Sequence, residues 1–212
     1  MRKIILALVV FIGLAYAEEE IILTQEQTKE LDTKCKDGNI RECAFLGESY
    51  FLPYNGISSR DFKKAAFYYK KVCKKDNEKD KYFFKACSAL GIIYAFGGDG
   101  VKQNYEKALG FSNLACDAGD ADACRTIGLT YYSGVGVPQD LAKGAEYFQK
   151  ACVAGSWMAC SNFAQHHYNH GDKGKATSYF KKACELGKDD PSAQIVPEFE
   201  EAWQYACDRY EN

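Results

Sequence analysis

The sequence predicts an all-α fold, a right-handed α-solenoid of stacked antiparallel helix pairs that local disulfides staple together. The pair Cys116 and Cys124 recurs 36 residues later in the chain, and a fixed period of that length is typical of stacked helix pairs. Positions 0, 3, 4 and 7 after the second cysteine of each pair repeat small and apolar residues, which is the spacing of one helical face. Ten cysteines behind an N-terminal apolar run indicate disulfides.

The first 17 residues are typical of a secretory signal. Arg2 and Lys3 precede the apolar run 4–14, and Ala15, Tyr16 and Ala17 have the small-x-small pattern of a cleavage site. A membrane anchor is the alternative, but the run is too short to span a bilayer comfortably. We therefore expect cleavage near Ala17 and a secreted or periplasmic protein with no membrane span in its mature form.

The predicted mature chain, residues 18–212, has room for one extended domain. Its formal net charge changes from −2 to −4 when Arg2 and Lys3 are removed. This mild acidity excludes nucleic acid as the expected partner, because nucleic-acid binding needs a basic surface.

The second cysteine of each pair opens a predicted helix, called helix A. Three, four and seven positions later the repeats carry an apolar residue, a glycine or alanine, and an aromatic ring or histidine. These residues are Leu46, Gly47 and Tyr50; Leu90, Gly91 and Tyr94; Ile127, Gly128 and Tyr131; Phe163, Ala164 and His167. A glycine in a helix costs about 1 kcal/mol relative to alanine, so its recurrence indicates close approach of another helix backbone.

The partner, helix B, ends at the first cysteine of each pair. Eight positions before that cysteine the repeats carry a small residue, and five positions before it an aromatic one: Ala65 and Tyr68, Ala108 and Phe111, Gly144 and Tyr147, Ala176 and Tyr179. Glycine-rich loops at 96–100 and 133–138 allow a tight turn between A and B.

These patterns divide the predicted domain, residues 18–212, into half-units and repeats. A half-repeat covers about 24–36, four repeats follow, and a capping helix covers about 197–210. The repeats are about 43–73, 87–116, 124–152 and 160–184. The charged insert 74–86 is expected to lengthen the neighbouring helices by a turn or so.

The pattern from Cys124 through the Gly-x-Gly-Val loop to Lys150, Ala151 and Cys152 resembles the Sel-one-like repeat, a relative of the tetratricopeptide repeat. Cysteines eight apart at each junction resemble the Helicobacter cysteine-rich protein family of secreted proteins. The resemblance implies penicillin binding and slow beta-lactamase activity as a possible function.

Each cysteine pair joins the end of one B helix to the start of the next A helix, so periodicity predicts sequential disulfides. The expected bonds are Cys35–Cys43, Cys73–Cys87, Cys116–Cys124, Cys152–Cys160 and Cys184–Cys207. Zinc-type CxxC spacing is absent from the sequence, and we expect no cofactor and no metal.

Two clusters could carry chemistry. Ser178 and Lys181 match the Ser-x-x-Lys element of serine acylation, but they stand at offsets off the buried face, where a solvated helix surface is the alternative. His166 and His170 stand four residues apart, as metal ligands on one helix face would. Packing and surface positions are the alternative for these histidines, and no carboxylate or cysteine completes a ligand set.

A binding surface remains. Positions two, six and nine of helix A are predicted to line the concave side, and in the third and fourth repeats they carry short polar side chains. The candidate groove residues are Thr126, Thr130, Asn162, His166 and Asn169. The same offsets in the first two repeats hold Phe45, Ser49, Leu52, Ala89, Ile93 and Phe96, which predicts a groove that is apolar at one end and polar at the other.

We therefore expect a secreted or periplasmic scaffold that binds a protein, a peptide or a peptidoglycan-like ligand in its concave groove. The alternative, implied by the family resemblance alone, is a slow hydrolase of beta-lactams.

Overall fold

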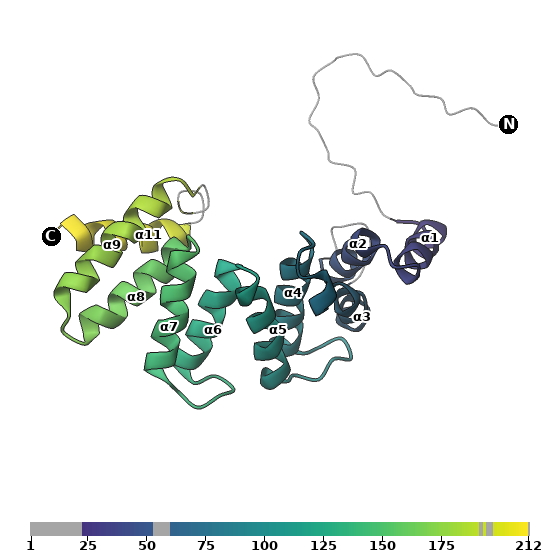
Figure 1. Ribbon diagram of the computed structural model, residues 1–212, viewed down its shortest axis with the longest axis horizontal. Helices are drawn as coiled ribbons and strands as arrows, with labels where there is room; N and C mark the ends of the chain where they lie inside the picture. Colours follow the sequence, from purple (N-terminus) through teal and green to yellow (C-terminus); the bar gives the residue numbers. More distant parts are fainter. Residues whose placement is uncertain (1–22, 53–59, 191–192, 194–196, 212) are drawn as a thin grey trace, which may run out of the picture.

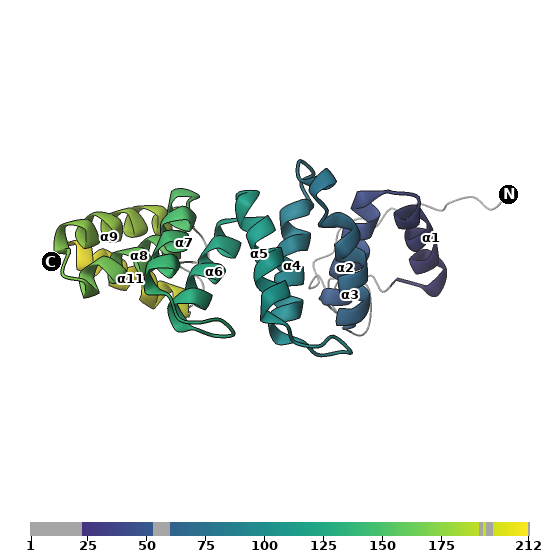
Figure 2. The ribbon, with the colours of Figure 1, turned by 60° about the horizontal axis from the view of Figure 1, so that its bottom comes forward.

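The computed structural model describes residues 23–52, 60–190, 193 and 197–211. The expected signal peptide lies outside them. The described part is α-helical and contains no strand, which confirms the all-α solenoid class. Its helices stack in chain order into an arc, with α1 at one end and α9 and α11 at the other (Figures 1 and 2).

The A helices alternate with the B helices along the arc. The A helices are α2 (Ile40–Phe51), α4 (Phe83–Phe96), α6 (Ala121–Ser133) and α8 (Trp157–Asn169). The B helices are α3 (Phe62–Val72), α5 (Tyr105–Asp117), α7 (Leu141–Val153) and α9 (Lys173–Lys188). The end elements are α1 (Gln25–Lys36), which packs on α2, and α11 (Pro197–Glu211), which packs on α9. Within the described part, no helix is long and apolar enough to cross a membrane.

Side-chain caps set where the helices begin. Asp120 ends the junction between α5 and α6, and its Oδ1 accepts hydrogen bonds from the backbone N–H groups of Asp122 and Ala123. Such a cap satisfies amides that have no partner inside the helix. Gly119, with φ of 99°, makes the reversal just before it in a left-handed conformation that suits glycine. The A helices α2, α6 and α8 therefore begin three residues before their cysteine rather than at it.

The charged insert after the first repeat differs from its prediction. It does not lengthen α3, which ends at Val72, and it adds one residue to the start of α4 compared with the other A helices. The segment instead forms the short 3-10 helix η1 (Lys75–Asn77) and turns. The Asn77 side-chain amide donates to the carbonyls of Lys71 and Val72, so it satisfies carbonyls that a longer α3 would have used.

The A and B helices approach each other through their small residues. A Cβ atom added to Gly128 would lie 2.6 Å from the Phe148 ring and 3.1 Å from the carbonyl oxygen of Gly144. In each repeat the aromatic or histidine ring at position seven of helix A stacks on the aromatic ring of helix B. These pairs are Tyr50–Tyr68, Tyr94–Phe111, Tyr131–Tyr147 and His167–Tyr179. The small-residue and aromatic offsets read from the sequence therefore mark one repeated packing interface.

Disulfides fix the junctions between repeats. The structure contains Cys35–Cys43, Cys73–Cys87, Cys116–Cys124, Cys152–Cys160 and Cys184–Cys207, the five pairs expected from the period, and the described part has no free cysteine. All ten cysteines are buried. Five disulfides are typical of a protein that folds in an oxidising compartment outside the cytoplasm.

Two glycine substitutions test the packing of A against B. Gly128→Ala should lower the free energy of unfolding by about 1–3 kcal/mol, because its Cβ overlaps the Phe148 ring. Gly110→Ala, within α5, has no neighbouring atom within 4 Å and should raise that free energy by about 0.5–1 kcal/mol through helix propensity. Urea unfolding of both variants measures the difference. Equal effects would contradict the close approach of α6 and α7.

Candidate functional site

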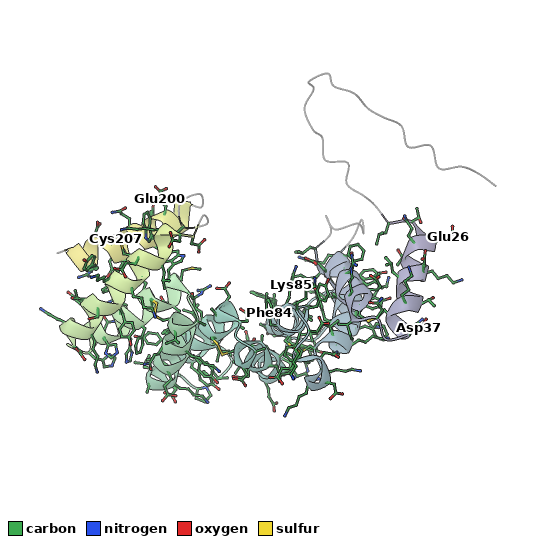
Figure 3. All side chains as sticks on the ribbon, turned by 45° about the horizontal axis from the view of Figure 1, so that its top comes forward. Glu26, Asp37, Phe84, Lys85, Glu200 and Cys207 are labelled. Carbon is green, nitrogen blue, oxygen red and sulfur yellow. A yellow bond between two sulfur atoms is a disulfide. The ribbon has the colours of Figure 1, made fainter. Side chains whose placement is uncertain are left out.

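A groove of about 650 Å³ lies between α4, α5 and α6. We call it the inner groove. Figure 3 labels Phe84 and Lys85, two of its residues, near the middle of the arc on α4. Its apolar lining comes mainly from α4 and α5, and α6 with the junction before it contributes carboxylate and hydroxyl groups. The lining includes Phe84, Lys85, Ser88, Ile92, Phe96, Tyr105, Leu109, Asp120, Asp122, Thr126, Thr130 and Val135.

Large apolar side chains remain exposed around this groove. Phe96 leaves 76% of its surface uncovered and Val135 leaves 53%, while Phe84 and Ile92 each leave 43%. Single exposed apolar residues are ordinary, but several that line one concavity mark a surface that binds another molecule. A volume of several hundred Å³ with an apolar lining is also the usual size of a ligand site.

The α6 side of the groove supplies polar groups. The Asp120 carboxylate is engaged, since it caps α6 and accepts a hydrogen bond from the Ser88 hydroxyl. The Asp122 carboxylate is more open, with 76% of its side chain exposed and only a 3.9 Å contact to Nε of Arg125. The groove therefore pairs an apolar wall with an accessible negative charge at its edge.

The structure brings together only part of the predicted groove. Thr126 and Thr130 line the inner groove, and the Thr130 hydroxyl donates to the carbonyl of Thr126. Asn162, His166 and Asn169 lie on α8 in the next repeat and are not among the lining residues. Oδ1 of Asn169 accepts a 2.7 Å hydrogen bond from Nε2 of Gln165.

The predicted stripe in the first two repeats is partly wrong. Ser49 and Ile93 are fully buried and Ala89 is 6% exposed, so these offsets belong to the core there. The Ser49 hydroxyl donates to the carbonyl of Phe45 four residues earlier, which satisfies its hydrogen bond inside the helix. Of the stripe, Phe45 and Phe96 remain exposed.

Most groove residues were outside the predicted set, and three of them illustrate the physical reason. Tyr105 and Leu109 lie on helix B, and Ile92 stands at an A-helix offset that the prediction did not use. Helix B was assigned only a core face in the sequence. An apolar residue beside that face, such as Leu109, was the available signal for a second contact surface.

The ring of His166 is partly buried on α8. Burial lowers the pKa of its ring below the ordinary 6.5, and the nearby His170 and His167 lower it further. The His166 and His170 rings lie 4.2 Å apart between centroids. Among the described residues no group of three or more His, Cys, Asp or Glu side chains could hold a metal ion.

Ser178 and Lys181 lie exposed on α9, and the contacts described for their side chains are with other residues. The Ser178 hydroxyl donates to the carbonyl of Gly174 at 3.1 Å. Nζ of Lys181 lies 4.0 Å from the Glu185 carboxylate and 5.4 Å from the centre of the Tyr210 ring. A serine nucleophile needs a base within hydrogen-bond reach, and these contacts direct both side chains elsewhere.

The histidine cluster gives a pH prediction. We expect His166 to titrate below pH 6.5 in the folded protein, and His170→Gln to raise its midpoint by removing a like charge. The pKa of His166 is then lower in the folded protein than in the unfolded chain, so the unfolded chain binds the proton first as pH falls. The His166 contribution to the free energy of unfolding should therefore decline as pH falls through 6.5. NMR titration of the ring protons measures the midpoints. A His166 midpoint at or above 6.5 would contradict the burial of this ring.

Comparisons with known proteins agree with the stack of repeated helix pairs. The family model described as Sel1 repeat matches residues 43–77, 84–120, 121–156 and 159–188. No curated protein matches the chain. The structure is similar to a Sel1 repeat protein of Oxalobacter formigenes, with a TM-score of 0.61, 22% identity, and coverage of 88% of this chain and 78% of that one.

Two further solved structures are similar. One is c5321, a protective antigen of uropathogenic Escherichia coli with an SLR fold, at TM-score 0.61 and 19% identity, covering 87% of this chain and 40% of that one. The other is Helicobacter pylori cysteine rich protein B, at TM-score 0.45 and 28% identity, covering 63% of this chain and 94% of that one. The four matched segments together span more than half of the sequence, and the chain therefore belongs to the Sel1 repeat family.

Proposed function

We propose that this protein is a secreted or periplasmic scaffold that binds a protein or peptide segment in its inner groove. The observation that carries the proposal is the groove itself, with Phe84, Ile92, Phe96 and Val135 exposed around one concavity between consecutive repeats. Repeat solenoids characteristically present extended binding surfaces of this kind.

An extended peptide fits the shape and chemistry of the groove. Apolar side chains of the peptide would cover Phe96 and Ile92, which now face solvent. The Thr126 and Thr130 hydroxyls, at the other wall, retain acceptor lone pairs for peptide N–H groups. A cationic residue of the peptide would suit the open Asp122 carboxylate.

Rigidity supports binding in a preformed site. The wall formed by α5 is joined to the wall formed by α6 through the Cys116–Cys124 bond, and both helices are capped at their start. A surface that is already ordered loses little conformational entropy when a ligand binds.

The proposed location rests on two features of the chain. Residues 1–17 have the pattern of a secretory signal, and the five disulfides require an oxidising compartment to persist. The hydrolase alternative gains no support from the described contacts of Ser178. We therefore propose binding as the function.

Alanine substitutions of exposed apolar residues inside and outside the inner groove test whether the groove binds the ligand. Phe96→Ala and Ile92→Ala should each weaken binding of the best ligand from a peptide library, including cell-wall stem peptides, by about tenfold, which is ~1.4 kcal/mol. Val153→Ala is the matched control, because Val153 is 74% exposed and does not line the groove. Isothermal titration calorimetry measures the affinities.

Two outcomes decide the location of the site. Unchanged affinity in both groove variants, with the fold intact by circular dichroism, would contradict the inner groove. Asn162→Ala and Asn169→Ala then test the α8 surface instead. A loss of about 1 kcal/mol in either would indicate one lost neutral hydrogen bond there.

A further inference from the structure

A second hollow, of about 600 Å³, is lined by six lysines. We call it the lysine pocket. The lysines come from α3, the segment after it, the loop that joins α4 to α5, and the first turn of α5. They are Lys63, Lys70, Lys71, Lys74, Lys102 and Lys107. No residue of the inner groove lines this pocket, so its chemistry is separate from the proposed peptide site. The α4–α5 loop projects from the lower edge of the arc (Figure 1).

Within the part of the chain that the structure describes, none of the six ammonium groups forms an ion pair. Ten ion pairs occur elsewhere in that part. Two acidic groups near the pocket are already engaged. Asp99 in the loop pairs with Nε of Arg60 at 3.3 Å. Asp32, which interacts electrostatically with Lys71, pairs with Lys36 at 2.6 Å.

Aromatic rings hold several of these lysines in place. Nζ of Lys70 and Nζ of Lys107 lie 5.2 and 5.5 Å from the centre of the same Tyr94 ring. Nζ of Lys71 lies 5.1 Å from the centre of the Phe67 ring. Two cations from different helices therefore lie near one buried ring, which stacks on the partly buried Phe111. Such contacts stabilise cations without neutralising them.

The result is a concentrated positive field on a chain whose formal net charge is −2. A cleft lined by one sign of charge attracts ligands of the opposite sign. The N-terminus of α5, capped by Asn104, also borders the pocket and adds partial positive charge from the helix dipole. The pocket therefore favours a ligand with several negative charges.

The kind of lysine site narrows the ligand class. The lining contains lysine and no arginine, so it offers point charges rather than the planar fork that binds one carboxylate or one phosphate through two hydrogen bonds. Lysine point charges suit phosphate groups. The surface is also hollow rather than flat, which favours a chain that enters it over a membrane surface. We propose that the lysine pocket binds a soluble polyanion that carries phosphate groups.

Inorganic polyphosphate is the probe, and two double variants that remove the same charge provide the test. Lys70→Gln with Lys107→Gln should weaken binding by about tenfold or more and reduce the dependence of affinity on salt, because fewer counterions are released. Lys29→Gln with Lys173→Gln, two exposed lysines outside the pocket, should change affinity by less than about twofold. Calorimetry at several salt concentrations gives both quantities. Phe96→Ala should leave polyphosphate affinity unchanged, which separates this site from the inner groove.

Three results would overturn the proposal. The first is equal weakening by the two double variants, since general electrostatic attraction would then explain binding. The second is tighter binding to phosphatidylglycerol vesicles or to a poly-glutamate peptide than to polyphosphate. The third is the absence of polyphosphate binding at low salt by a protein whose circular dichroism and urea midpoint are normal.

Discussion

The architecture depends on the covalent link between the end of each B helix and the start of the next A helix. Without that link, neighbouring repeats would be joined only by a short turn and by packing. The Cys116–Cys124 bond holds the two Cα atoms 4.7 Å apart across the junction of α5 and α6. In the chain-entropy account, a loop of this size contributes about 2.6 kcal/mol of stability. The bond also fixes the junction that borders the inner groove.

Within each repeat, a second constraint keeps A and B in register. The small residues on both helices let the backbones approach, as the 3.1 Å separation between an added Gly128 Cβ and the Gly144 carbonyl shows. The stacked rings beside them fill the remaining space, and His167 takes the tyrosine position in the fourth repeat. Together the two constraints make a stack of similar units, so the surfaces between units are defined before any ligand arrives.

The sequence predicted the elements of the stack because each is set by local spacing. The 36-residue period and the face at positions 0, 3, 4 and 7 are properties of one helix pair. The prediction that the insert 74–86 lengthens the neighbouring helices was wrong for α3, because the Asn77 side chain binds the last carbonyls of that helix. Residue spacing alone does not predict such a contact. The prediction that Ser49 and Ile93 line the groove was wrong. Position six of helix A is buried in the first two repeats and only partly buried in the third and fourth. The inner groove and the lysine pocket each join residues from several segments, and a pattern within one helix cannot reveal that combination.

Peptide mapping of the unreduced, purified protein tests this account most directly. Digestion followed by mass spectrometry should find five links between consecutive cysteines, including Cys116 to Cys124 and Cys184 to Cys207, with no free thiol after denaturation. Such a result would show that every junction of the solenoid is covalently closed. A link between distant repeats, such as Cys43 to Cys116, or two or more free thiols would contradict the arrangement on which the inner groove depends.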